Sequence, residues 1–363
     1  MKQSRDIEST ILNRKPKKTN IDIRFPTGSD LMDIQVGGGE GIGYPGGKII
    51  NFVGDKSSGK TFLACEIIAA SFYKHKERLK WIYDDCESGF SFDTKTLYGV
   101  EIMPMDQKKR TKSKTVEDAY GNCRLFFESI KDNEIGIYVI DSLDSLNDKE
   151  GEKIADEQFA KFKKRKQSPQ DKEEKEKGSY RMAKPKYLSN TFFPVLSSLI
   201  EKKNCLLIII SQVRCNLDPM SFEKFTRAGG KAMDFYAHTV LWLASVEDII
   251  KKGIPIGAVT KAKNTQSKTP RPRRSVFIKL LFDYGIDNIQ SNIDYLYDLL
   301  TPRGKLGKNV SVEWDDETYT RLALIKHIED NNLQRELKKR MIAKWEALEA
   351  SVKTNRPPKY QTR

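Results

Sequence analysis

The sequence predicts an α/β fold, in which a mostly parallel, twisted sheet carries helices on both faces and a small helical region follows. Three observations predict it. Short apolar runs, typical of buried strands, alternate with helical segments along most of the chain. A glycine-rich loop separates the first core strand from a helix. Towards the C-terminus, apolar residues repeat at three- and four-residue steps, as in amphipathic helices.

Length and charge bound the organisation of the chain. Its 363 residues are enough for one large α/β core and a smaller appendage. We expect a basic N-terminal segment at 1–25, the core at 26–300, and a mainly helical region with a basic tail at 301–363. The formal net charge of +14 indicates a polyanionic partner.

Composition also indicates the compartment. No apolar run approaches about 18 residues, so we expect no membrane span. The first residues lack the apolar core of a signal peptide. The five cysteines form no C-x-x-C pair, and Cys65 and Cys205 lie in apolar runs where free, buried thiols are expected. A cytoplasmic location fits these features best.

The predicted strands begin at residue 48. A glycine-rich stretch at 37–47 precedes the first of them, so we favour a tight turn there over a dinucleotide-binding fingerprint, whose glycines follow a strand. The last two strands are joined by a basic turn. The runs that we assign to strands are 48–53, 80–85, 135–141, 205–211, 239–244, 253–263 and 275–287.

The loop GDKSSGKT at 54–61 fits the phosphate-binding pattern G-x-x-x-x-G-K-[ST]. Strand, loop and helix follow one another as that role demands, so backbone N–H groups and a helix N-terminus would face the phosphates. Lys60 would reach the terminal phosphates and Thr61 would hold magnesium. We expect the nucleotide to contact Gly54, Asp55, Lys56, Ser57, Ser58, Gly59, Lys60 and Thr61.

Hydrolysis of a bound nucleotide needs a carboxylate for the metal and a base for water. Asp141 ends a buried strand, the usual position of the acid that orients the Mg²⁺ shell. At the end of another strand, YDDCESG offers Asp84, Asp85 and Glu87. Asp85 and Glu87 would share one face if that strand continued, so either could be the base.

Polar residues also follow the strand at 205–211. Ser211 and Gln212 stand where a side chain could sense the terminal phosphate of a nucleotide. A simple turn at the end of the strand is the alternative.

Two segments depart from the strand–helix alternation. Residues 148–187 carry 13 Lys/Arg and 9 Asp/Glu, which predicts either a solvated, mobile excursion or a contact with nucleic acid. Residues 321–353 predict a long amphipathic helix or a helix pair, whose apolar stripe is either the core of a small domain or a surface for a partner. The stripe consists of Leu333, Leu337, Met341, Trp345, Leu348 and Val352.

The order of these motifs resembles the RecA family of strand-exchange proteins from bacteria and phages (the RecA and UvsX type). The resemblance covers about residues 25–290 and includes the Gly-Gly-x-Ala-x-x-Phe-Tyr-Ala run at 229–237, which is more specific than a phosphate loop alone. It implies a RecA-type ATPase core that uses ATP and Mg²⁺. It also implies a helical filament of many copies on single-stranded DNA, strand exchange with double-stranded DNA, and the cytoplasm of a bacterium or phage-infected cell.

Carried over by position, the resemblance implies residue roles. Lys60 serves the phosphates, Thr61 and Asp141 serve the metal, Glu87 polarises water, and Gln212 reports the γ-phosphate to a DNA-binding loop at about 213–228. The other DNA loop would follow Asp141, within the basic insertion, and the segment at 1–25 would serve oligomerisation. The residues expected to contact DNA are Arg214, Phe222, Lys224, Phe225, Arg227, Gly229 and Gly230, with Met220 as a further apolar group.

The chain departs from the family pattern at several positions. Ser211 replaces an asparagine, and Asp234 and Val240 replace basic residues that contact neighbouring subunits. Lys263 matches a lysine that reaches the neighbour's ATP, but Thr265 replaces the second lysine of that motif. Either Lys263 acts alone, a nearby lysine substitutes, or this basic hairpin contacts only DNA backbone. The C-terminal tail is basic, whereas the bacterial tail is acidic.

Two other functions remain as alternatives. A hexameric helicase or translocase on the same core would need an N-terminal collar, and about 47 residues precede the first core strand. An ATP-gated mediator that binds single-stranded DNA needs no hydrolysis. The presence of Glu87, Asp141 and Gln212 together favours an active ATPase over that reading.

Overall fold

The structure, a computed structural model, describes most of the chain. The described ranges are 23–37, 43–105, 112–167, 183–215, 225–268, 272–301, 303–305, 311–354 and 356. Side chains at 164–167 and 183 lie outside this description.

A nine-stranded sheet forms the centre of the molecule, in the order β11-β10-β9-β8-β3-β6-β5-β4 with β7 paired to β6. Five neighbouring strands are parallel. The apolar residues of three of the predicted runs, at 49–53, 135–140 and 206–210, are all buried, which explains their continuous apolar sequences. The predicted α/β class with a parallel, twisted sheet is therefore confirmed. The parallel strands are β8 (Thr239–Lys251), β3 (Lys48–Gly54), β6 (Leu206–Cys215), β5 (Ile135–Asp141) and β4 (Leu79–Asp85).

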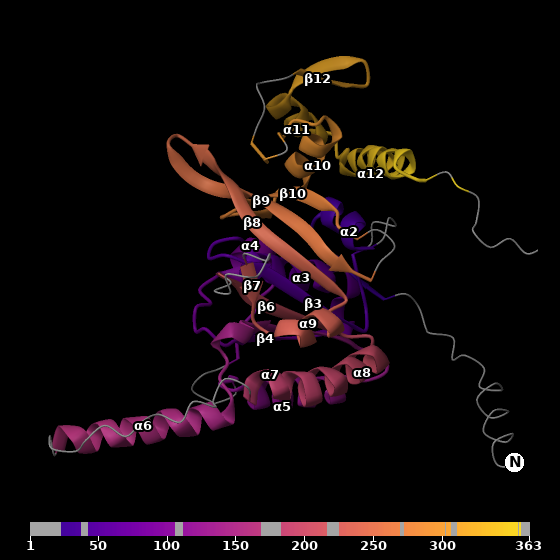
Figure 1. Cartoon of the computed structure of the whole chain (residues 1–363). Coiled ribbons are helices and arrows are strands. Elements are labelled where there is room, and N and C mark those ends of the chain that lie inside the picture. The colour runs from indigo at the N-terminus through magenta and orange to yellow at the C-terminus, as the bar shows by residue number, and fades with distance from the viewer. Residues whose placement is uncertain are drawn as a thin grey trace, which may run out of the picture.

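Antiparallel strands extend one edge of the sheet. β8 forms a long hairpin with β9 (Ile254–Ser267), and β10 (Ser275–Leu281) and β11 (Gly285–Ile286) continue it. β8 runs seven residues past the end predicted at 244, because its pairing with β9 continues to a two-residue turn with positive φ at Lys252 and Gly253. The tip of this hairpin projects from the body of the molecule (Figure 1).

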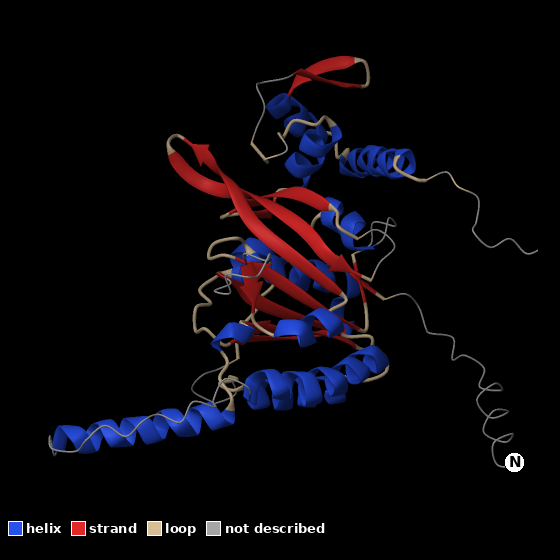
Figure 2. Ribbon diagram, in the orientation of Figure 1, coloured by secondary structure: helices blue, strands red, loops and turns tan. Residues whose placement is uncertain are grey.

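Helices cover both faces of the sheet, as the sequence predicts (Figure 2). Successive side chains of β3 alternate: Ile50 and Phe52 pack with one buried cluster, Ile49 and Val53 with the other. The first cluster includes α2 (Asp30–Gly37) and α3 (Lys60–His75); the second includes α5 (Val116–Ser129) and α8 (Phe193–Lys203). All five cysteines are free thiols, and Cys65 and Cys205 are buried as expected.

The basic insertion begins with α6 (Lys149–Gln167), a 19-residue helix that extends away from the sheet (Figure 1). The charge count did not indicate a helix there. Most of its described side chains are exposed, including Phe159 and Phe162. The insertion continues beyond the described residues and returns through α7 (Ala183–Tyr187). The choice between a solvated excursion and a nucleic-acid contact stays open.

Short elements complete the core. They are β1 (Arg24–Phe25), β2 (Tyr44–Pro45), α4 (Thr94–Tyr98), β7 (Phe225–Arg227), α9 (Gly230–Tyr236), the 3-10 turns Lys76–Arg78 and Leu143–Ser145, and the π turn Leu188–Phe192.

In the described part of the chain no helix is both long and apolar enough to cross a membrane.

The C-terminal region contains the predicted helix pair. α11 (Arg321–Asp330) and α12 (Gln334–Ser351) follow α10 (Asn288–Leu296) and a hairpin that the sequence analysis missed, β12 (Ser311–Trp314) with β13 (Glu317–Thr320). The prediction that the apolar stripe of α12 forms one small core is partly wrong. Leu337 packs into the small C-terminal cluster, whereas Met341 and Trp345 pack into the main core. Leu348 and Val352 are exposed.

A buried charge cluster joins this region to the sheet. Asp294 of α10 forms ion pairs with Lys279 of β10 and with Arg321 of α11, whose Nε lies 2.6 Å from the carboxylate. The side chains of Lys279 and Asp294 are only 2% and 1% exposed. Each charge is therefore compensated inside the protein, and loss of Asp294 leaves both cations without their carboxylate.

We expect Asp294→Asn to lower the free energy of unfolding by about 3–5 kcal/mol, because Lys279 would then be a buried cation without a counterion. Urea unfolding, followed by tryptophan fluorescence, measures the loss. Asp298→Asn is the matched control: its pair with Lys344 is largely exposed on the aspartate side, so about 0–1 kcal/mol is expected. Equal losses in the two variants would contradict a stabilising role for the buried cluster.

Candidate nucleotide site and DNA-loop stems

The phosphate-loop sequence connects the carboxyl end of β3 to the N-terminus of α3. Gly59 has φ of +89° and precedes the first helical residue. This backbone conformation requires glycine, and a Cβ here would also lie 2.4 Å from Leu280 Cδ1 and displace that side chain. The N–H groups of the first turn of α3 therefore lie open at the loop, where they can bind an anion.

Lys60 spans this loop. Its Nζ donates to the carbonyl oxygens of Gly54 and Asp55, at 2.8 and 2.6 Å. Partial burial lowers the pKa of Lys60, and the nearby carboxylates of Asp141 and Glu87 oppose that shift. This ammonium group is placed to exchange loop carbonyls for phosphate oxygens.

Thr61 and Asp141 lie together, as expected for the metal position. The hydroxyl of Thr61 donates to Asp141 Oδ2 at 2.7 Å, and Tyr83 donates to the same oxygen at 2.6 Å. Burial raises the pKa of Asp141, while these two donors oppose the shift. Hydroxyl and carboxylate oxygens are the donors that Mg²⁺ prefers, so this pair fits the ion that ATP would bring.

The structure separates the two candidates for the base. β4 ends at Asp85, and the chain turns, so Asp85 and Glu87 do not share a strand face. Asp85 accepts hydrogen bonds from the backbone N–H groups of Gly89 and Phe90, at 3.2 and 2.9 Å, and so stabilises this turn. Glu87 lies at the ends of β5 and β6, and its role as the base stays a prediction.

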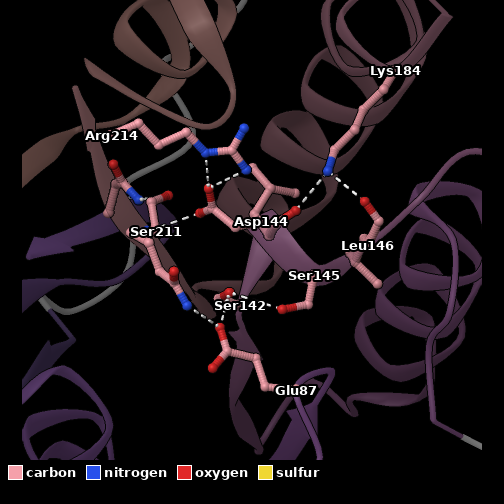
Figure 3. A network of polar contacts seen from close by, with 11 residues as sticks. Glu87, Ser142, Asp144, Ser145, Leu146, Lys184, Ser211 and Arg214 are labelled. Atoms are coloured by element: carbon pink, nitrogen blue, oxygen red, sulfur yellow. Dashed lines mark hydrogen bonds and ion pairs between the residues drawn. The ribbon is translucent and has the colours of Figure 1, made fainter. Parts of the chain in front are cut away.

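Glu87 contacts two of those strand ends (Figure 3). Its Oε1 accepts a hydrogen bond from Ser142 Oγ, just after β5, and one from Gln212 Nε2 on β6 at 2.8 Å. The residue proposed to polarise water and the residue proposed to report the γ-phosphate are therefore in direct contact. Ser211 points elsewhere: its buried hydroxyl accepts from Asn51 at 2.9 Å.

Sequence reasoning missed a further carboxylate beside Gln212. Asp144 Oδ2 accepts a hydrogen bond from the Gln212 backbone N–H at 2.8 Å, and its Oδ1 lies 2.7 Å from Arg214 Nη2 (Figure 3). Lys184 Nζ donates to the carbonyls of Leu143 and Leu146, on either side of Asp144. No local pattern indicates these contacts, because they depend on β5 and β6 being neighbours.

The expected DNA-contacting residues lie in different environments. Met220, Phe222 and Lys224 fall outside the described residues. Phe225 is exposed on β7, and Gly229 and Gly230 begin α9 with positive φ. Of the residues expected to contact DNA, the structure therefore describes Arg214 before this gap and those from Phe225 onwards after it.

Arg227 turns inward, unlike the exposed Arg214. Its side chain is only 8% exposed, forms an ion pair with Asp234 and donates to Asn51 Oδ1 at 2.5 Å. The ion pair uses Asp234, the aspartate that departs from the family pattern. The hydrogen bond to Asn51 connects β7 to β3.

Lys263 is exposed on β9. In the sheet, Gly54 of β3 pairs with Leu243 of β8, which pairs with Ala262 of β9. Lys263 therefore stands two strands from the phosphate loop and at the same level. Its expected action on a neighbouring subunit stays a prediction.

Comparisons with known protein sequences agree on one family. The RecA N-terminal domain family matches residues 7–162 and 166–287. The RecA protein of Ehrlichia ruminantium is 28% identical over 270 residues, which are 74% of this chain and 66% of that protein. The RecA protein of Rickettsia prowazekii is 27% identical over 279 residues, covering 77% and 72% of the two chains.

Coverage of the relatives is partial. The matched part of the chain spans slightly less than two thirds of the length of the Ehrlichia relatives. It covers 84% of the RecA protein of Mesoplasma florum, at 25% identity over 311 residues. Among solved structures, a RadB recombinase aligns with a TM-score of 0.45 and 17% identity, over 72% of this chain and 98% of that one.

Proposed function

The chain belongs to the RecA family, and from this membership we propose that it is an ATP-dependent recombinase acting on DNA. It forms filaments on single-stranded DNA and promotes homologous pairing and strand exchange with double-stranded DNA. Hydrolysis of ATP depends on that DNA and on Mg²⁺. The protein works in the cytoplasm of a bacterium or of a phage-infected cell.

One observation carries the proposal: Gln212 Nε2 lies 2.8 Å from Glu87 Oε1. Gln212 stands where β6 leads into the expected DNA loop at 213–228, and Glu87 stands at the expected nucleotide site. A displacement of the loop stem on binding DNA would move a group that touches the proposed base. This contact gives a physical route by which DNA can control hydrolysis.

The residues around the loop support a hydrolytic mechanism. The N–H groups of the phosphate loop and Lys60 Nζ hold the phosphates and stabilise charge as the terminal phosphoryl group leaves. Mg²⁺, held through Thr61 and Asp141, would neutralise charge on the phosphates. Glu87 orients and polarises the attacking water. Gln212 controls which way the carboxylate of Glu87 faces.

Charge and exposed side chains support the DNA partner. The net charge of +14 favours a polyanion, and Arg214 and Phe225 are exposed on the stem of the expected loop. A guanidinium binds phosphate, and an aromatic ring stacks on bases without regard to sequence. The roles of the segment at 1–25 in oligomerisation and of Lys263 across the subunit interface belong to the same proposal.

Electron microscopy with single-stranded DNA and a non-hydrolysable ATP analogue tests the function. We expect helical filaments that require both DNA and nucleotide. Closed rings would instead indicate a helicase or translocase, and DNA-bound particles without polymers would indicate a mediator. Either of these two outcomes would overturn the recombinase proposal.

A further inference from the structure

We propose that Asp144 is a positioning residue that keeps the ATPase in a low-activity state until DNA displaces it from Arg214. The inference rests on the proposed function. We call the contacts of the Asp144 carboxylate with the Arg214 guanidinium and the Gln212 N–H the Asp144 latch. A DNA phosphate that binds Arg214 opens the latch, and Gln212 then leaves Glu87.

Both oxygens of the Asp144 carboxylate accept hydrogen bonds from residues of β6. Oδ2 accepts from the Gln212 N–H at 2.8 Å, and Oδ1 accepts from Arg214 Nε at 2.9 Å and lies 2.7 Å from Nη2. These contacts join the turn after β5 to the strand that enters the expected DNA loop (Figure 3). One side chain therefore holds the stems of both expected DNA loops together.

The two partners differ in how far they can move. The side chain of Asp144 is 6% exposed, whereas that of Arg214 is 58% exposed. Asp144 lies in the 3-10 turn Leu143–Ser145, whose flanking carbonyls accept hydrogen bonds from Lys184 Nζ at 2.7 and 2.5 Å. The anion is thus fixed in the core, and the cation faces solvent, where a phosphate can reach it.

A phosphate can compete with Asp144 for this cation. Solvent screens this pair on the Arg214 side, where exposed pairs change an equilibrium by about two- to five-fold, and Lys184 still offsets the charge of Asp144 once Arg214 leaves. Arginine binds phosphate in the same bidentate manner as carboxylate. Single-stranded DNA brings one phosphate per nucleotide along its backbone, so it can replace Asp144 at Arg214 without large cost.

The opening of the latch reaches the base through Gln212. The backbone N–H of Gln212 is bound to Asp144 and its side-chain amide to Glu87, so the two contacts fix one residue from both sides. Glu87 Oε1 accepts from Ser142 as well. Two donors on one oxygen compete with a water molecule for that carboxylate. Once Gln212 moves away, Glu87 can accept from the attacking water.

Asp144→Asn tests the latch, since asparagine keeps the shape and an oxygen for the Gln212 N–H but loses the charge that holds Arg214. We expect its hydrolysis rate without DNA to rise about two- to five-fold, and half-saturation by single-stranded DNA to need about two- to five-fold less DNA. The rate at saturating DNA should match wild type. The salt slope of DNA binding should steepen by about 0.7, because Arg214 no longer exchanges one anion for another.

Arg214→Ala opens the latch from the other side and separates it from a merely structural role. It should raise the DNA-free rate as Asp144→Asn does but weaken DNA binding, and the double variant should show no further rise in that rate. Glu128→Ala is the control: it removes a carboxylate–arginine pair of the same 2.7 Å separation on α5, and should change neither quantity. Thermal unfolding shows that each variant is folded.

These experiments distinguish a failure of the Asp144 latch from a failure of the proposed DNA-dependent hydrolysis. Wild-type hydrolysis that DNA does not stimulate would overturn both proposals. DNA-stimulated wild type with a folded Asp144→Asn variant of unchanged DNA-free rate and DNA half-saturation would overturn the latch alone. A DNA-free rate that falls in both Asp144→Asn and Arg214→Ala would also overturn it, by showing that these contacts support the active arrangement.

Discussion

Glu87→Gln is expected to lower the kcat of ATP hydrolysis by about 10²–10⁴-fold, the range for loss of a general base. The amide oxygen can still accept from Ser142 and Gln212, so the local structure should remain. An amide cannot take up or polarise a proton as a carboxylate does. ATP and DNA binding should therefore persist, and the variant should hold its DNA complex longer than wild type.

Steady-state hydrolysis with and without single-stranded DNA measures this effect, together with nucleotide affinity from a fluorescent analogue. Asp85→Asn is the matched control, because Asp85 accepts only from backbone N–H groups of its own turn among the described contacts. We expect it to change kcat little at a temperature where the variant is folded. Slower turnover in Asp85→Asn with normal turnover in Glu87→Gln would mean that the wrong acid has been chosen.

Lys60→Ala is expected to reduce ATP hydrolysis by about 10²–10³-fold, since the loop loses the preorganised cation beside the phosphates. The same variant loses the ammonium group that would exchange the Gly54 and Asp55 carbonyls for phosphate oxygens, so ATP affinity should also fall. Turnover and nucleotide binding are measured on the purified variant. Lys80→Ala provides the control: it removes one cation from the opposite end of β4, where Lys80 pairs with Glu134 on the surface. Undiminished turnover in Lys60→Ala would remove the phosphate-loop assignment.

Local patterns predicted the parts of the site that are contiguous in sequence. The phosphate loop needs a strand, a glycine turn and a helix that follow one another directly, and local sequence patterns indicate all three. The choice between Asp85 and Glu87 could not be made, because a two-residue period holds only while the strand lasts. β4 ends at Asp85, and Ser88 takes a positive φ in the turn that follows.

Contacts between distant segments could not be predicted. Asp144 and Arg214 are separated by 70 residues and meet only because β5 and β6 are neighbours. Arg227 was expected to contact DNA, and its largely buried side chain has polar partners in Asn51 of β3 and Asp234 of α9. An isolated basic residue in a loop sequence carries no sign of such partners.

Two misses had signals in the sequence. The hairpin at 311–320 alternates buried Val312 and Trp314 with exposed neighbours, and Asp315 and Asp316 form its two-residue turn with positive φ. The helix α6 is rich in Glu, Lys, Gln and Ala, which have high helix propensity, although its charge count resembles that of a solvated segment.

The position of β3 at the centre of the sheet has a consequence for biosynthesis. Ile50 pairs with Ile208 on one side and Thr239 on the other, so the strand that carries the phosphate loop waits for about 160–190 further residues to leave the ribosome. At about 5–20 residues per second, that delay is roughly 10–40 s. During it the apolar strand β3 lacks both of its partners, which favours aggregation and makes the protein a client for chaperones. Expression at lower temperature, or with added chaperones, should therefore raise the yield of soluble protein more than any change at the surface.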